Sequence, residues 1–136
     1  MTVVTESGGA ESGSANTESK PDVQELARLA AEAAEAKMAR DLVAFDVGDR
    51  IALVEVFLIC TADNERQAVA VARNIEEQLS RHGRGVVRRE GERDGDWVLL
   101  DYGDLVIHLM QPEAREHYSL ERLWKDCPKL DLGAES

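Results

Sequence analysis

The chain has 136 residues, with 27 Asp and Glu against 16 Lys and Arg, which gives a formal net charge of −11 and a pI of about 4.7. Proteins that capture nucleic acid through its phosphates need a basic face, so this charge excludes that class and favours a cationic partner. No apolar run approaches the roughly 20 residues that span a bilayer, and the first residues lack the basic and apolar regions of a secretory signal. We therefore expect one cytoplasmic domain with no membrane partner.

Both ends of the chain differ in composition from its middle. Residues 1–20 are rich in Ser, Thr, Gly and Glu and offer no apolar face, so burial cannot offset the entropy of ordering them. We expect a disordered tail over 1–20, a folded domain over 21–128 and a flexible C-terminal tail over 129–136. The two cysteines, Cys60 and Cys127, are too few and too far apart for a disulfide framework or a paired metal motif.

The first elements of the domain are a helix and two strands. Ser19 fits an N-cap with a carboxylate three residues later, and good helix formers with one apolar stripe continue through residue 39. Apolar, partly β-branched segments predict a strand over 41–47, ended by Gly48, and a second strand within 51–61. The second strand is apolar enough to be buried on both faces, so we expect the pair at the centre of the core.

A second helix follows these strands. Apolar residues recur at helical spacing from Ala68 to Leu79, with Asp63 or Asn64 as the N-cap and Gly83 just after the last turn. The capping and spacing signals together predict an amphipathic helix.

The last third of the chain begins with a hairpin. Apolar runs predict short strands over 86–89, 97–101 and 105–110. The last two are joined through Tyr102 and Gly103, where Gly103 supplies the positive φ that a tight turn needs.

Two short helices complete the domain. Pro112 suits the first position of a helix, and Ser119 is the candidate N-cap of a last helix in which Leu120, Leu123 and Trp124 share a face. The order helix-strand-strand-helix-strand-strand-strand-helix-helix predicts an α/β or α+β domain with a mixed, partly antiparallel sheet flanked by helices.

Residue types used in catalysis are present but lack the spacing of a known site. Asp94-Gly95-Asp96 has the spacing with which two carboxylates hold a divalent ion, yet Asp and Gly are also typical of an exposed turn. His82, His108 and His117 form no metal-binding pattern, and His108 in an apolar strand is typical of a hydrogen-bonded structural residue. The sequence therefore predicts no catalytic residue, no metal site and no cofactor.

The large aromatic residues gather in the last third, interleaved with charged residues. Trp, Tyr and Arg are the types that most often anchor protein interfaces, although each tryptophan also suits the core. Asp101 and Asp104 flank Tyr102 in the hairpin turn, and we expect this tyrosine to be exposed. These residues favour an acidic, non-catalytic domain that presents an interface in its last third.

Several separated motifs resemble the ribosomal silencing factor (Iojap/RsfS) family. The resemblance covers residues 21–126 and includes Asp46 and Arg66-Gln67. Its motifs in the last third are Glu90-Gly91, Trp97–His108, Arg115, Tyr118 and Leu120–Trp124. Residues 62–64, Ala-Asp-Asn, depart from the family's Gly and small polar pair; this alters a ribosome contact if the turn makes one, whereas Asp or Asn caps a helix equally well.

The resemblance implies a small mixed α/β domain, similar in fold to nucleotidyltransferases but without their catalytic residues. It implies binding to the large ribosomal subunit through ribosomal protein L fourteen, which blocks joining of the small subunit and represses translation under nutrient limitation. We expect Tyr102 and Trp124 as apolar anchors and Asp101, Asp104 and Glu121 as partners for basic groups. The full set of expected partner-binding residues is Trp97, Asp101, Tyr102, Gly103, Asp104, His108, Arg115, Tyr118, Glu121, Arg122 and Trp124.

Two alternatives remain at this point. A nucleotidyltransferase-like enzyme would use magnesium held by Asp94, Asp96 and Asp101, which requires carboxylate oxygens about 2.0 to 2.6 Å from one point. A homodimer joined through the aromatic surface is compatible with ribosome binding. If the last third is not the interface, the helix entry at 63–67 is the next candidate.

Overall fold

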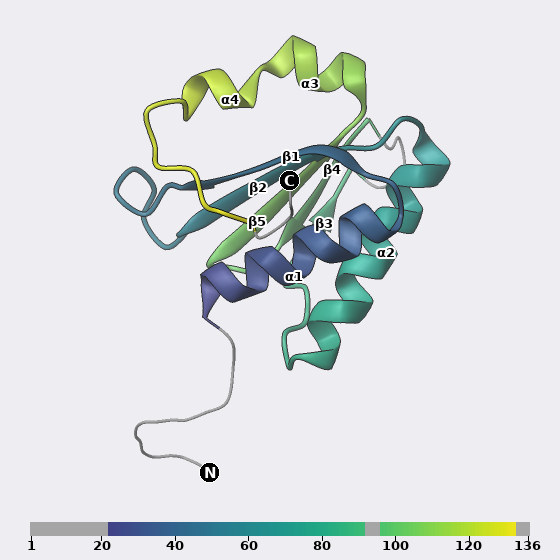
Figure 1. The fold of residues 1–136 in the computed structure, drawn as a ribbon, viewed down its shortest axis with the longest axis horizontal. Helices are drawn as coiled ribbons and strands as arrows, with labels where there is room; N and C mark the ends of the chain where they lie inside the picture. Colours follow the sequence, from purple (N-terminus) through teal and green to yellow (C-terminus); the bar gives the residue numbers. More distant parts are fainter. Residues whose placement is uncertain (1–21, 92–95, 133–136) are drawn as a thin grey trace.

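The computed structural model describes residues 22–91 and 96–132, which form a five-stranded sheet with helices on both faces (Figure 1). The expected N-terminal tail and Asp94 lie outside these ranges. In chain order the elements are α1 (Val23–Ala36), β1 (Arg40–Asp46), β2 (Val56–Thr61), α2 (Glu65–Arg81), β3 (Arg88–Glu90), β4 (Trp97–Asp101), β5 (Leu105–Met110), α3 (Pro112–Tyr118) and α4 (Leu120–Leu123). The predicted order of helices and strands and the mixed α/β fold are confirmed.

The sheet has the strand order β1-β2-β5-β4-β3. The central pair, β2 and β5, is parallel, and every other neighbouring pair is antiparallel. A parallel central pair is normally covered on both sides, which agrees with the continuous apolar run of β2.

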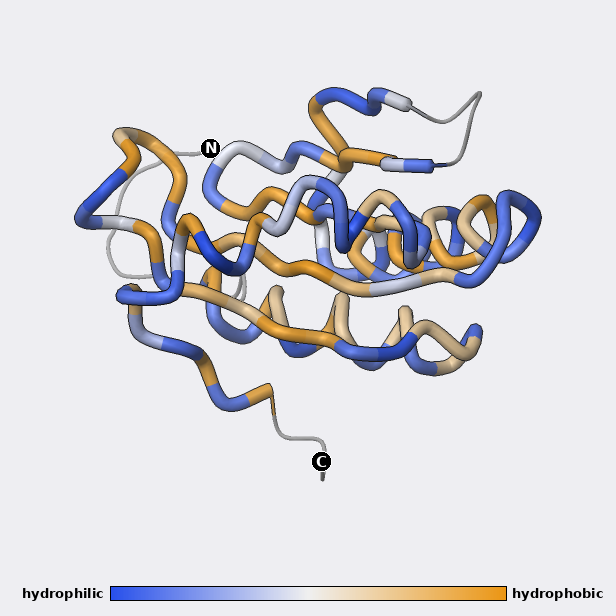
Figure 2. The backbone as a smooth tube through the Cα atoms, turned by 90° about the horizontal axis from the view of Figure 1, so that it is seen from above, coloured by the Kyte–Doolittle hydropathy of each residue, from blue (hydrophilic) through white to orange (hydrophobic). Residues whose placement is uncertain are grey.

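Alternation along the strands divides the buried side chains between the two faces of the sheet. On β2, Leu58 and Cys60 belong to the core beneath α1 and α2, whereas Ile59 belongs to a second core beneath α3 and α4, with Phe57 packed against it. Figure 1 shows the two helix pairs on opposite sides of the sheet. Figure 2 shows largely apolar strands and helices that alternate between apolar and polar positions, as elements with one buried face do.

The caps of the two long helices follow local rules with one correction. Asp22, not Ser19, is the N-cap of α1, and its carboxylate accepts a hydrogen bond from the Glu25 backbone N–H at 2.8 Å. Asn64 caps α2 in the same way through the Gln67 backbone N–H at 2.8 Å. Gly83 follows α2 with φ of 81°, as predicted for the residue after a helix.

The C-terminal segment packs further than expected. The Asp46 backbone N–H donates to the Pro128 carbonyl at 2.8 Å, and the Leu130 N–H donates to the Ala44 carbonyl at 2.9 Å, so this segment lies along the edge strand β1. Leu130 and Leu132 pack against the core beneath α1. The expected domain boundary at residue 128 is therefore too early. An edge strand offers free backbone groups for pairing, and the C-terminal segment binds those of β1.

Smaller differences concern element ends. The strand expected over 86–89 lies at Arg88–Glu90, and the link between β4 and β5 includes Asp104 as well as Tyr102 and Gly103. Leu123 is 61% exposed and does not share the buried side of α4 with Leu120. No helix within the described ranges is long and apolar enough to cross a membrane.

Candidate functional site

The residues expected to bind a partner do not form one continuous surface. Trp97 begins β4 and pairs with Met110, whereas Asp101 ends β4 and pairs with Val106. These two ends of β4 are about 13 Å apart at the usual rise of a strand. We call residues 101–104 the turn.

The polar groups of the turn are used within the fold. The Asp101 carboxylate accepts a hydrogen bond from the Gly103 backbone N–H at 2.8 Å, and Gly103 has φ of 90°. The Arg84 guanidinium, 20% exposed, donates to the Asp104 carboxylate at 2.7 Å and to the Tyr102 carbonyl at 3.0 Å. Asp104 is therefore an internal ion-pair partner that ties the turn to the segment after α2.

The expected exposure of Tyr102 is wrong. Its side chain is 3% exposed and belongs to the core beneath α1 and α2. It continues the alternation of Val98 and Leu100, which face the same core, so the strand's periodicity places it inside. Burial raises the pKa of its hydroxyl, which has no hydrogen-bond partner among the described residues.

The opposite face of the sheet carries a connected row of rings, which we call the aromatic face. It consists of Phe57 on β2, Trp97 on β4, His108 on β5, Tyr118 on α3 and Trp124 after α4. Ring centroids are 4.6 Å apart for Trp97 and Tyr118, 5.9 Å for Trp97 and His108, 4.8 Å for His108 and Phe57, and 5.3 Å for Phe57 and Trp124. Each ring therefore contacts the next across three strands and both short helices.

The rings of the aromatic face differ in exposure. Tyr118 is 51% exposed, and Phe57, Trp97 and Trp124 are half-buried. The indole nitrogen of Trp124 is buried and has no hydrogen-bond partner among the described residues. The tryptophans thus serve both the core and the surface, which the sequence left open.

His108 holds the centre of the row and is 6% exposed. The Trp97 indole N–H donates to its Nδ1 at 3.1 Å, so Nδ1 is the acceptor and the neutral ring carries its proton on Nε2. Burial lowers the pKa of His108 from 6.5 to about 4. This geometry confirms the hydrogen-bonded structural role expected for a histidine in this strand, and its burial keeps the ring from direct contact with a partner.

A hollow of about 410 Å³ borders the aromatic face next to Trp97 and Tyr118. Its lining includes the exposed residues Asp96, Glu113 and His117. No ion pair joins either carboxylate to a cation of the described residues. Aromatic walls beside carboxylates that have no ion-pair partner among the described residues form a surface that suits a cationic group.

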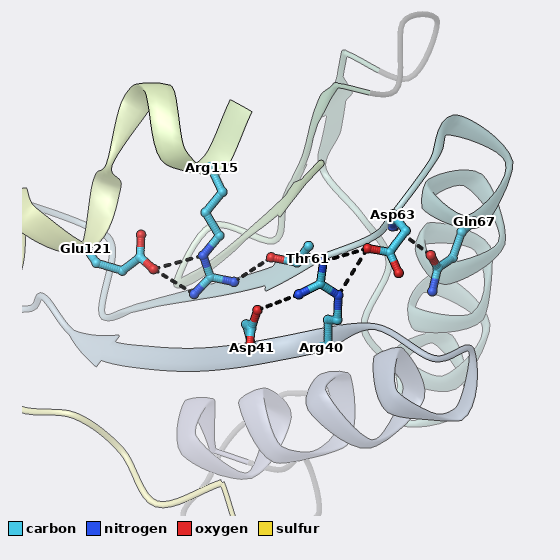
Figure 3. A network of polar contacts seen from close by, with 7 residues as sticks. All are labelled: Arg40, Asp41, Thr61, Asp63, Gln67, Arg115 and Glu121. Carbon is cyan, nitrogen blue, oxygen red and sulfur yellow. Dashed lines mark hydrogen bonds and ion pairs between the residues drawn. The ribbon is translucent and has the colours of Figure 1, made fainter. Parts of the chain in front are cut away.

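Arg115 joins the short helices to the sheet (Figure 3). Its guanidinium is 14% exposed and donates to the Glu121 carboxylate at 2.8 and 2.7 Å and to the Thr61 hydroxyl at 2.8 Å. Thr61 ends β2, so one side chain connects α3, α4 and the centre of the sheet. Arg122 is exposed on α4 and lines a shallow hollow with Arg115 and Glu121.

Residues 62–64, which depart from the family pattern, and the helix entry after them make contacts within the fold (Figure 3). The Asp63 carboxylate accepts from the Arg40 guanidinium at 2.7 and 3.0 Å, and its backbone N–H donates to the Gln67 side chain at 2.7 Å. Ala62 is fully buried and Asn64 caps α2. Asp and Asn at these positions therefore serve the helix entry as capping and ion-pairing residues.

The carboxylates of the enzymatic alternative are not brought together. Asp96 precedes β4 and Asp101 ends it, with the strand between them, while Asp94 lies outside the described ranges. Within residues 22–91 and 96–132, no three His, Cys, Asp or Glu side chains are grouped so that they could hold a metal ion. Cys60 is fully buried, and burial raises the pKa of its thiol to about 12.

Sequence reasoning missed four residues of the site, Phe57, Thr61, Arg84 and Glu113, and considered Asp96 only as a metal ligand. The expected burial of β2 on both faces is confirmed, since Leu58 and Cys60 face one core while Ile59 and Phe57 face the other. The apolar pattern gave no indication that Phe57 joins the row of rings or that Thr61 binds Arg115. No local sequence pattern indicated a role for Arg84, because its partner Asp104 lies 20 residues away in the chain.

The comparisons with known proteins agree with this fold. Residues 20–136 match the family described as "Ribosomal silencing factor during starvation". The chain is 37% identical over 107 residues to ribosomal silencing factor RsfS of Bacillus subtilis, which covers 79% of the chain and 91% of that protein. It is 34% identical over 89 residues to a mouse protein named mitochondrial assembly of ribosomal large subunit protein 1, which covers 63% of the chain and 39% of that protein.

A solved structure is similar as well. A crystal structure of a Chromobacterium violaceum protein has a TM-score of 0.75 and 33% identity, covering 84% of this chain and 94% of that one. The family match over all of the described residues, the high coverage of the bacterial relative and the similar crystal structure lead to one conclusion: the chain belongs to the ribosomal silencing factor (RsfS/Iojap) family.

Proposed function

We propose that this protein binds the large ribosomal subunit through ribosomal protein L fourteen and sterically blocks joining of the small subunit, which represses translation under nutrient limitation. Family membership supports a ribosome-associated regulator. The mouse relative, named for assembly of the mitochondrial ribosomal large subunit, supports the large subunit as the partner. Binding to ribosomes would place the protein in the cytoplasm.

The observation that carries this proposal is the aromatic face. Trp97, Tyr118 and Trp124 belong to one row of rings, connected through His108 and Phe57, on the sheet side that α3 and α4 cover, and Tyr118 is half exposed. Rings already held by neighbours lose little conformational freedom on binding, which is a property of interface hot spots. We propose Tyr118, Trp97 and Trp124 as the apolar contacts.

We place the charged contacts with the partner next to these rings. Asp96 and Glu113 line the hollow next to Trp97 and Tyr118 and have no ion-pair partner among the described residues. We propose that they face basic groups of the partner, since opposite charges accelerate association in a salt-dependent way. Asp101 and Asp104, which already have contacts inside the fold, are the weaker candidates.

We further propose that the protein acts by occupying a surface and not by catalysis. Any self-association of two copies would use the same aromatic face and compete with the ribosome. Sedimentation velocity of the protein alone over a range of concentrations tests for self-association. A competing dimer would make ribosome occupancy rise less steeply than the total protein concentration, because only the free monomer would bind.

The test of the function is co-sedimentation with purified large subunits in sucrose gradients, followed by addition of small subunits. We expect the parent protein to travel with large subunits and to reduce the joined ribosome peak. Tyr118→Ala should weaken affinity in co-sedimentation by roughly 5- to 150-fold, because hot-spot side chains contribute about 1 to 3 kcal/mol.

Leu53→Ala is the control, since Leu53 is 91% exposed in the loop between β1 and β2 and belongs to neither core. It should bind like the parent. A parent protein that stays at the top of the gradient would contradict the proposed function, and equal binding by Tyr118→Ala and the parent would contradict the proposed surface.

A further inference from the structure

The two short helices meet at a corner that their own hydrogen bonds hold weakly. α3 has seven residues and α4 has four, and Ser119 between them adopts the left-handed conformation, with φ of 49° and ψ of 50°. The Ser119 hydroxyl donates back to the Glu116 carbonyl at 2.7 Å and makes no capping hydrogen bond to α4. Helices this short are not stable by themselves, so contacts from elsewhere must set the angle between them.

Arg115 supplies these contacts across the corner. It lies on α3, before Ser119, and its guanidinium binds Glu121 on α4, after Ser119. The same group binds Thr61 on β2, which fixes the pair against the sheet (Figure 3). The planar guanidinium fork holds its partners in one geometry, unlike a lysine ammonium.

Each side of the corner carries one ring of the aromatic face. Tyr118 directly precedes Ser119 and packs on Trp97, whereas Trp124 follows α4 and packs on Phe57. A change in the corner angle would therefore move one ring relative to the other.

We propose that Arg115 and Glu121 are positioning residues: their ion pair sets the angle of the α3–α4 corner and so holds Tyr118 and Trp124 in the arrangement that binds the partner. This inference rests on the proposed function and changes the role that the sequence suggested for both residues. Arg115 is too buried and too fully bonded to serve as a surface contact, and its carboxylate partner Glu121 is bound to it.

The test separates positioning from contact by two independent measurements. The chain has two tryptophans, so a proton–nitrogen NMR spectrum has two indole signals, which Trp97→Phe and Trp124→Phe assign. The first measurement is the position of these signals, and the second is affinity for purified large subunits in co-sedimentation.

Arg115→Lys and Glu121→Gln are the variants, and Glu77→Gln is the control because it removes an exposed ion pair, with Arg81 on α2, away from the aromatic face. Arg115→Lys keeps the charge but loses the fork, so a simple charge contact would survive it. We expect Arg115→Lys and Glu121→Gln to shift the Trp124 indole signal and to weaken binding at least 5-fold. The control should change neither. Glu121→Gln serves alone if Arg115→Lys fails to fold.

Unshifted indole signals would overturn the proposal, whether binding is kept or lost, because lost binding with unmoved rings indicates direct contact. A shifted signal with parental affinity would overturn the link between ring arrangement and binding. If the parent itself does not co-sediment, the proposed function fails, and the indole shift alone decides whether the ion pair between Arg115 and Glu121 positions the rings.

Discussion

The motif Trp97–His108 contributes residues to both the turn and the aromatic face, which use those residues in different ways. In the turn, the Asp101 carboxylate accepts a hydrogen bond from the Gly103 backbone N–H, the Tyr102 side chain is buried in the core, and Asp104 pairs with Arg84. On the aromatic face, Trp97 and Tyr118 hold each other and keep part of their rings at the surface. The difference teaches that a family motif contains residues that shape the domain as well as residues available to a partner.

Trp97→Ala should have the largest effect on the aromatic face. It removes the ring beneath Tyr118 and the hydrogen bond to His108, so we expect about 3 kcal/mol of lost unfolding free energy and a strong loss of ribosome binding. Urea denaturation and co-sedimentation at a temperature where the variant is folded measure the two effects. Parental binding by the folded variant would show that this ring belongs only to the core.

The buried histidine predicts a pH dependence of stability. The folded-state pKa of His108, about 4, lies below its unfolded value of 6.5, so the unfolded chain takes up a proton first as pH falls. The contribution of His108 to the free energy of unfolding is therefore retained above pH 6.5 and lost as the pH falls from 6.5 to 4. Between pH 7.5 and pH 5 this loss is about 2 kcal/mol. Urea denaturation at both values should give this loss for the parent and a smaller one for His108→Gln, whereas equal losses would assign the dependence to other groups.

Arg84→Ala tests the structural role of the turn. Loss of the guanidinium leaves the Asp104 carboxylate and the Tyr102 carbonyl without their partner, and we expect about 1 to 2 kcal/mol less unfolding free energy. Arg81→Ala, which breaks an exposed pair on α2, should cost well under 1 kcal/mol. Ribosome binding by folded Arg84→Ala should equal that of the parent, and a selective loss of binding would give the turn a contact role.

Tyr102→Phe has the smallest expected effect and the opposite sign. It removes a buried hydroxyl without a hydrogen-bond partner among the described residues and keeps the ring, so stability should stay constant or rise by about 1 kcal/mol. Thermal denaturation measures this change. A clear loss of stability would mean that the hydroxyl has a partner, and a loss of binding would restore Tyr102 as an anchor.

Local patterns predicted the elements, whereas distant contacts decided the site. The Asn64 cap, the helical spacing of α2 and the positive φ of Gly103 depend on a few neighbouring residues and were readable in the sequence. The left-handed Ser119 and the bond from Arg115 to Thr61, 54 residues away, depend on how the helices fold back over the sheet. Tyr102 was misplaced because its flanking carboxylates suggested a surface, while strand alternation turned it inward.

The central claim is that Tyr118 on the aromatic face, and not the turn, touches the large subunit. Photo-crosslinking tests it most directly, with a photoreactive residue placed at Tyr118 in one protein and at Val87 in another. Val87 is 72% exposed and its backbone N–H binds the Asp101 carbonyl, so it marks the turn. We predict a crosslink to ribosomal protein L fourteen from position 118 and none from position 87; crosslinks from 87 with none from 118 would contradict the account.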